Sequence, residues 1–270
     1  MPSREADVAG RHSKVLEYVI EHGRADVNEL SGLFAVSKVT IRKDLDRLEK
    51  RGLIRREHGA AVAVESDNVL SRLAFHYETK RRIARAAAAS ISDGDTVMIE
   101  SGSCSALLAD EIAIHKRDVT IITNSAFIAG FVRTAPYARI VLLGGDYQTD
   151  SQVLVGPLLA QAAANFHVDR MFIGIDGYTE QSGFTGRDHM RAEAVRVMAQ
   201  QARELIVLSE SLKFPRQGAV QLVPASAVAR VFTDDHLPLE IQTQLTSAGI
   251  TVTKALADPQ SLTTAEKEPT

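Results

Sequence analysis

Residues 36–59 carry the densest set of side chains that could contact a polyanion. This segment holds eight Lys/Arg against four Asp/Glu, in a chain whose formal net charge is −3. Lysine and arginine neutralise the phosphates of nucleic acids, and a helix that is apolar on one side and basic on another fits the major groove of DNA. The alternative is an ordinary solvated helix with charges on its surface.

A group that could hold an anion follows later, at Ser101-Gly102-Ser103-Cys104-Ser105. The glycine permits close approach, the hydroxyls donate hydrogen bonds, and a helix that begins here would offer free backbone N–H groups. This chemistry suits a phosphate, although a plain turn with capping serines is the alternative. Cys104 could be a reactive thiol, since a helix N-terminus lowers a thiol pKa, or simply a small residue that fits.

Helical spacing must position the basic segment. Ile41, Leu45 and Leu48 form one apolar seam, and Ser37 is a good N-cap because its hydroxyl can accept a free first-turn N–H. Two further helical patterns lie within residues 11–34, and the second places Val27, Leu30, Leu33 and Phe34 on one side. We therefore expect three short helices packed as a helix-turn-helix.

The segment that follows, residues 53–59, reads as a short strand and a turn. Its side chains Arg55, Arg56 and His58 could contact phosphates as a wing, which would set register and make affinity salt-dependent.

Two aspartates of the basic helix would be repelled by phosphates. We expect Asp44 and Asp46 to face inward or to pair with Arg42, Arg47 or Lys50.

Apolar runs alternating with helical patterns predict the fold of the remainder. Strands are expected at 96–100, 119–123, 139–143, 169–175, 204–208 and 229–233, which indicates a mostly parallel α/β sheet covered on both faces. Ligands bind such sheets beyond the carboxyl ends of the strands. Those ends carry Ser101–Ser105, which we call the serine loop, and the pairs Asn124-Ser125, Gly144-Gly145 and Asp176-Gly177. Each pair alone would usually be a turn.

Both halves of the chain resemble one family. Thr40-Ile-Arg-Lys-Asp-Leu45 and the spacing from Leu48 to Gly59 resemble the N-terminal signature of the DeoR family of bacterial repressors, with Ala60 in place of the usual second glycine. Thr123-Asn-Ser125, Leu143-Gly-Gly145, Val155-Gly-Pro157, Gly174-Ile-Asp-Gly177 and Ser211-Leu-Lys-Phe214 resemble its effector domain, which is akin to the ribose-5-phosphate isomerase fold. The resemblance implies a winged helix-turn-helix that binds operator DNA and a C-terminal domain that binds a phosphorylated sugar or related metabolite.

Residue types and the resemblance together assign two sets of site residues. Those expected to contact DNA are Ser37, Lys38, Thr40, Arg42, Lys43, Arg47, Arg55, Arg56 and His58. Those expected to contact the effector are Ser101, Gly102, Ser103, Cys104, Ser105, Asn124, Ser125, Gly144, Gly145, Asp176, Gly177 and Lys213.

Departures from the family pattern indicate an altered ligand. The usual Asp-Ser-Gly-Thr-Thr is Glu100-Ser-Gly-Ser-Cys104 here, and the usual Asp-Ser-Ser-Lys is Glu210-Ser-Leu-Lys213. The stretch Phe184-Thr-Gly-Arg-Asp188 is similar to the YciT-type subgroup of the family, so we name no particular sugar.

Composition and length set the remaining expectations. The first 62 residues hold 12 Lys/Arg against 10 Asp/Glu, so DNA binding must depend on a local patch and not on the field of the whole molecule. A single cysteine excludes an internal disulfide and a multi-cysteine zinc site. No apolar run is long enough to span a bilayer and no signal segment is evident, so we expect a cytoplasmic protein without membrane contact, metal or cofactor.

We expect a DNA-binding domain at 1–62, a linker at 63–78, an effector domain at 79–258 and a flexible tail at 259–270. One short recognition helix seldom binds tightly enough alone, so a homo-oligomer, a dimer or a tetramer, is expected on paired half-sites.

Two functions remain open. The first is a transcriptional repressor controlled by a phosphorylated sugar. The second is a sugar-phosphate isomerase with an appended helix-turn-helix, for which Asp176, Glu193 and Lys213 supply the residue types of a base and an enediolate stabiliser. Gly177-Tyr178 follows Asp176 where isomerases carry paired aspartates, which favours the repressor.

Overall fold

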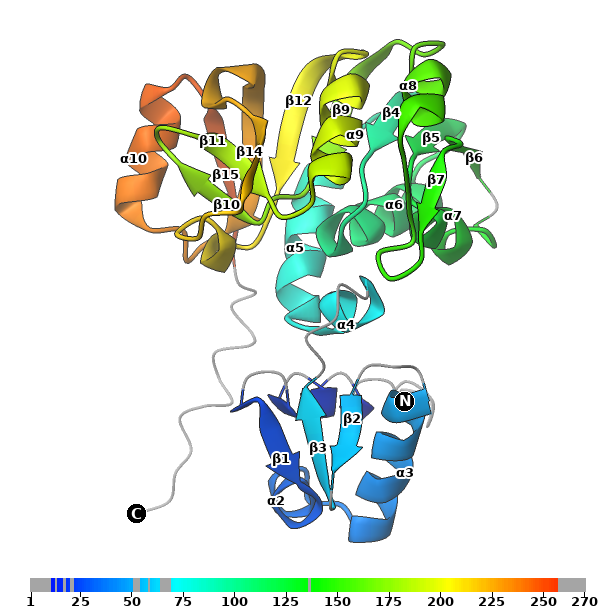
Figure 1. Cartoon of the computed structure of the whole chain (residues 1–270), viewed down its shortest axis with the longest axis vertical. Coiled ribbons are helices and arrows are strands. Elements are labelled where there is room, and N and C mark those ends of the chain that lie inside the picture. The colour runs from blue at the N-terminus through cyan, green and yellow to red at the C-terminus, as the bar shows by residue number, and fades with distance from the viewer. Residues whose placement is uncertain are drawn as a thin grey trace. The chain divides into compact units, whose positions relative to one another are not determined.

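The computed structural model describes residues 11–12, 14–16, 18–19, 22–50, 54–57, 59–63, 69–135 and 137–256. His58 and the predicted tail at 259–270 lie outside these residues. The chain divides into two compact units, Met1–Tyr77 and Glu78–Thr270 (Figure 1).

The N-terminal unit is a winged helix-turn-helix, as predicted. Helical residues between 11 and 22 precede the remaining elements of the unit, which are β1 (Arg24–Asp26), α2 (Val27–Leu33), α3 (Lys38–Lys50), β2 (Ile54–Glu57) and β3 (Ala60–Ala63). The strands pair antiparallel in the order β1-β3-β2. Strand β1 was not expected, since three residues are too few to show an alternating pattern.

Apolar side chains at helical spacing form the core of this unit. Ile41, Leu45 and Leu48 are buried against Leu16 and Leu30, which confirms the predicted seam. Leu33 was expected on the buried side of its helix, but its side chain is 55% exposed because it lies at the edge of the apolar stripe.

The C-terminal unit is built on a parallel sheet. Within the described residues its strands are β4 (Thr96–Ile99), β5 (Val119–Thr123), β6 (Ala138–Leu142), β9 (Val168–Ile173), β12 (Ala202–Leu208), β14 (Val228–Asp234) and β15 (Thr251–Ala255). They pair in the order β15-β14-β12-β9-β4-β5-β6, and every pairing is parallel. The six predicted strands are all present; the edge strand β15 was missed.

Helices cover both faces of this sheet. They are α5 (Tyr77–Ala88), α6 (Ser103–His115), α7 (Ala126–Phe131), α8 (Pro157–Ala163), α9 (His189–Ala199) and α10 (Leu239–Ser247). The general rule that parallel crossovers are right-handed predicts α6 and α7 on one face and α8 and α9 on the other, and the contacts of α6 with α7 and of α8 with α9 agree with it. A further helix, α4 (Val69–Ala74), lies inside the segment predicted to be a linker.

Short antiparallel strands form two further small sheets in this unit. One hairpin joins β7 (Asp146–Gln148) to β8 (Val153–Val155), and a second small sheet pairs β10 (Gly177–Thr179), β11 (Gly183–Gly186) and β13 (Val220–Val223). The chain makes single helical turns at Ser211–Lys213 and Ala225–Ala227.

The order in which successive strands are added to the sheet reverses between β4 and β9, although all the strands are parallel. It runs from β4 outward to β5 and β6, and then returns to the other side of β4 for β9, β12, β14 and β15. Ligands of open parallel sheets bind beyond the carboxyl ends of the strands at such a reversal. The serine loop follows β4 and Gly174 follows β9, so the predicted anion site lies at this position.

Among the residues described, none of the helices combines the length and apolarity that crossing a bilayer requires.

Candidate DNA interface and anion site

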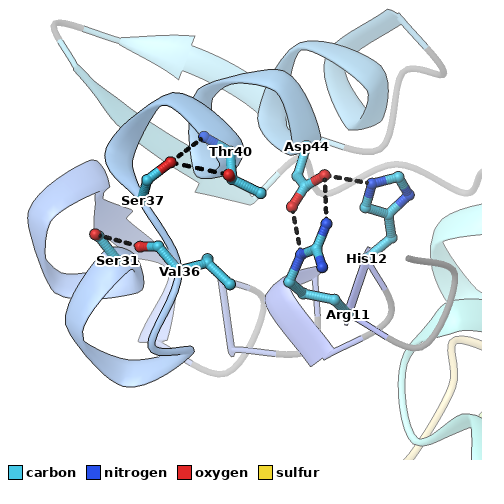
Figure 2. A network of polar contacts seen from close by, with 7 residues as sticks. All are labelled: Arg11, His12, Ser31, Val36, Ser37, Thr40 and Asp44. Atoms are coloured by element: carbon cyan, nitrogen blue, oxygen red, sulfur yellow. Dashed lines mark hydrogen bonds and ion pairs between the residues drawn. The ribbon is translucent and has the colours of Figure 1, made fainter. Parts of the chain in front are cut away.

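Ser37 fixes where α3 begins. Its Oγ accepts the backbone N–H of Thr40 at 3.2 Å and lies 2.9 Å from the Thr40 hydroxyl oxygen (Figure 2). Ser31 in α2 donates to the Val36 carbonyl oxygen at 2.6 Å, which holds the turn between the two helices. The predicted N-cap is therefore confirmed, and the Ser37 hydroxyl serves the helix itself.

The outward side of α3 is basic at its start. Lys38, Arg42, Lys43 and Arg47 are exposed, and Thr40 is half-buried. The first turn contains no acidic residue, so the positive end of the helix dipole and the lysines act in the same sense. These predicted DNA-contacting residues thus share one surface, with the apolar seam on the other side.

A buried carboxylate holds α3 to the helical residues Arg11 and His12. Asp44, whose side chain is 3% exposed, accepts hydrogen bonds from Arg11 Nε at 2.6 Å and Nη2 at 3.3 Å, and it lies 2.8 Å from His12 Nε2 (Figure 2). Burial raises the pKa of Asp44, but the hydrogen bonds and charges of Arg11 and His12 outweigh it and hold the pKa below its usual value. We call this group the Asp44 clamp.

The clamp corrects one expectation. Asp44 faces inward, as predicted, but its partners come from another helix and not from i±4 positions on α3. Asp46 likewise pairs with Arg56 of the wing.

Two arginines of the wing have different surroundings. The Arg56 guanidinium contacts Asp46, and its backbone N–H donates to Glu49 Oε1 at 2.9 Å, so this residue ties β2 to α3. Arg55 contacts Glu57 at 2.6 Å, but its side chain is 68% exposed. Arg55 is therefore the wing residue in the better position to reach a phosphate.

Some polar groups of the serine loop have no hydrogen-bond partner among the described residues. Gly102 is the N-cap of α6 and offers no side-chain cap to its first-turn N–H groups. The hydroxyl oxygens of Ser101 and Ser105 are buried, and no other described residue forms a hydrogen bond with them. A buried hydroxyl without a partner costs about 1–3 kcal/mol, so this arrangement fits a ligand that supplies acceptor oxygens.

Cys104 lies at the centre of this loop. Burial raises the pKa of its thiol to about 12, and the neighbouring Glu210 carboxylate adds to the rise. The thiol is therefore neutral, and the reactive alternative is not supported.

Charged residues from three other elements surround Cys104. Lys80 Nζ of α5 lies 3.3 Å from Glu210 Oε2, and both side chains are at most 3% exposed. Asp234 at the end of β14 accepts the backbone N–H of Ser211 at 2.7 Å. Lys80 and Asp234 were not predicted as neighbours of the serine loop, because neither lies in a recognisable motif and both are distant from it along the chain.

Two residues predicted to contact the effector, Asp176 and Lys213, lie close together in the structure. Lys213 Nζ donates to the Ile175 carbonyl oxygen at 2.9 Å and lies 3.5 Å from Asp176 Oδ1. Because Gly174 lies beside the Ser101 backbone, this pair is near the serine loop. The backbone of Gly177 approaches Arg216 so closely that a Cβ would collide with it.

The remaining predicted residues have structural contacts. Asn124 donates to the Leu154 carbonyl oxygen at 3.2 Å, and the Ser125 hydroxyl caps α7 by accepting the Ile128 N–H at 3.2 Å. At Gly145, after Gly144, φ is +146° and a Cβ would collide with the Val155 carbonyl. These residues join the ends of β5 and β6 to the β7–β8 hairpin.

Comparisons with known proteins agree with the two units. The family model "DeoR C terminal sensor domain" matches residues 75–235, and "DeoR-like helix-turn-helix domain" matches residues 11–67. A glycerol-3-phosphate regulon repressor of Escherichia coli is 30% identical over 87% of this chain and 94% of its own length. The regulator GolR of Listeria innocua is 28% identical over 90% of this chain and 96% of its own.

Among solved structures, ribose 5-phosphate isomerase A of Methanocaldococcus jannaschii aligns with a TM-score of 0.38 and 19% identity, over 52% of this chain and 55% of that one.

Asp44→Asn tests the clamp. Because the change removes the negative charge that Arg11 and His12 contact, we expect the free energy of unfolding of the N-terminal unit to fall by about 1–3 kcal/mol. Hydrogen exchange of the α3 amides in the full-length protein measures the loss. Asp46→Asn is the control, since Asp46 is 53% exposed on the same helix and should cost under about 1 kcal/mol. Equal losses in the two variants would contradict the clamp.

The same carboxylate makes stability depend on pH. Because the pKa of Asp44 is lower in the folded protein than in the unfolded chain, its contribution is complete above the unfolded value of about 4 and is lost as pH falls through the folded value. The difference in unfolding free energy between wild type and Asp44→Asn should therefore shrink below about pH 4. A difference that is constant across this range would show that the charge of Asp44 is not what stabilises the unit.

Proposed function

The chain belongs to the DeoR family of transcriptional regulators, and on that premise we propose that it represses genes whose operators it binds, until a phosphorylated sugar binds at the start of α6. The main observation that supports operator binding is the arrangement of side chains at the start of α3. Its cap, its exposed basic side chains and its buried opposite face are combined in a winged helix.

The chemistry of the serine loop supports a phosphorylated effector. Phosphate oxygens accept hydrogen bonds from hydroxyls and from the uncapped N–H groups at the start of a helix, and Ser101 and Ser105 have buried hydroxyls to donate. Lys213 would contribute positive charge nearby, and Asp176 could accept a hydrogen bond from a sugar hydroxyl. The name of one relative refers to a glycerol-3-phosphate regulon, which supports a phosphorylated metabolite as the class of effector.

The buried pair of Lys80 and Glu210 offers a route between effector and DNA. Lys80 is in α5, the first helix of the C-terminal unit, and Glu210 directly precedes Ser211 and Lys213. Breaking such a pair is costly, so a shift of this loop on effector binding would move α5 with it. The α5 helix continues the chain from the N-terminal unit. We propose that this link acts in a cytoplasmic homo-oligomer, in which two N-terminal units occupy paired half-sites.

The isomerase alternative gains no support at the end of β9. Gly177-Tyr178 follows Asp176, and the Asp176 carboxylate lies 3.5 Å from the Lys213 ammonium. We therefore assign the protein no catalytic step.

Arg42→Ala should weaken specific binding of DNA. Because Arg42 is exposed near the start of α3, we expect a loss of about 1–3 kcal/mol on a duplex obtained by in vitro selection with the full-length protein. Gel-shift titration at a fixed salt concentration measures the loss. Arg203→Ala is the control, since this 81% exposed arginine lies in the C-terminal unit. Wild-type affinity in the Arg42 variant would remove this residue from the base-reading set.

Ser105→Ala tests the effector site through two quantities, the melting temperature of the ligand-free protein and the affinity for the effector. Because the Ser105 hydroxyl is buried without a described partner, its removal should leave the melting temperature of the ligand-free protein unchanged or raise it. Because we expect that hydroxyl to donate to a phosphate oxygen, the same change should weaken effector binding about tenfold or more. Thermal-shift screening against phosphorylated sugars and their unphosphorylated parents, followed by calorimetry, measures both effects.

The control for this experiment is Ser90→Ala. The Ser90 hydroxyl donates to the Ala87 carbonyl oxygen at 2.6 Å, before the amino end of β4 and away from the serine loop. Its loss should destabilise the protein slightly and leave effector affinity unchanged. A Ser105 variant that behaves like this control would contradict the proposed site.

A further inference from the structure

One apolar side chain lies within the basic surface of α3. Val39 is the second residue of the helix and its side chain is 58% exposed. Its neighbours Lys38, Arg42 and Lys43 are exposed and positively charged. A β-branched residue also favours helix formation less than lysine or alanine does, so Val39 is not explained by local stability.

The frame of the N-terminal unit fixes the direction in which Val39 points. Val39 and the buried Leu48 are nine residues apart, about two and a half helical turns, so they lie on opposite sides of α3. Ser37 caps the helix immediately before this turn (Figure 2), and the contact of Asp44 with Arg11 keeps the opposite side of the helix buried. Val39 is therefore presented outward at the end of the helix that reaches base edges in helix-turn-helix proteins.

A partner of matching chemistry exists in the major groove. Among the base pairs, only those with thymine present a methyl group there, and apolar side chains recognise that methyl by contact. Lysine and arginine cannot make this distinction, because they bind phosphates or acceptor atoms. A lone exposed valine elsewhere on a surface would need no explanation, but this one stands where bases are read.

We propose that Val39 packs against the C5-methyl group of an operator thymine and so sets the base preference at that position. The proposal rests on the proposed function, because it needs a DNA-binding regulator. It adds a base-reading contact that the charge pattern of α3 did not indicate.

Replacement of single thymines by uracil tests the proposal, since uracil lacks only the methyl group. In vitro selection with the full-length protein first defines a preferred duplex. Each thymine of that duplex is then replaced in turn, and dissociation constants are measured for wild type, Val39→Ala and Leu33→Ala at one salt concentration. Leu33 is the matched control, because it is 55% exposed in the same unit but lies in α2.

We expect one thymine-to-uracil replacement to weaken wild-type binding about threefold to tenfold. Val39→Ala should weaken binding to the thymine duplex by a similar factor and then show no further loss with uracil at that position. Leu33→Ala should behave as wild type in both respects. Unchanged melting temperatures would show that each variant is folded, as the exposure of both side chains implies.

Two results would overturn the proposal. One is a Val39→Ala variant that keeps the full uracil sensitivity of the wild type, and the other is a wild type insensitive to uracil at every position. A selection that returns no preferred sequence would instead overturn the proposed function, and this inference with it.

Discussion

The position of α3, the helix that we propose reads DNA, depends on one buried carboxylate. Asp44 would repel phosphates if it were exposed, and it would cost several kcal/mol if it were buried without positive partners. Arg11 and His12 satisfy it from the first helix, so the inner side of α3 is electrically balanced while its outer side remains basic. The register between the first helix and α3 therefore decides which side chains face outward.

Buried charges of the C-terminal unit also have partners, whereas some of its buried uncharged polar groups do not. Its buried charges are in contact with partners, as Lys80 is with Glu210 and Asp234 is with the Ser211 N–H. The buried hydroxyls of Ser101 and Ser105 have no such partner among the described residues, and the same holds for Asn124 Oδ1 and Thr233 Oγ1 at the ends of two other strands. The contrast distinguishes groups that hold the fold from groups that a ligand would satisfy.

Periodicity and apolar runs predicted most of the fold. The seam of α3 and six of the seven described strands of the parallel sheet were predicted, because their apolar patterns extend over at least four residues. The prediction that Ser101–Ser105 connects a strand to a helix is also confirmed. The partners of Asp44 and Lys80 could not be found, because local patterns carry no information about contacts between distant segments. The close approach of Gly145 to Val155 could not be predicted either, and it requires a glycine at this position whether or not a ligand binds there.

The environment of Cys104 has a consequence for the conditions in which the protein can work. Thiolates react with peroxides, whereas a buried thiol with a pKa of about 12 stays protonated at neutral pH. The sole sulfhydryl of the chain is therefore protected at the very loop that we assign to the effector. Peroxide should therefore leave this loop chemically intact.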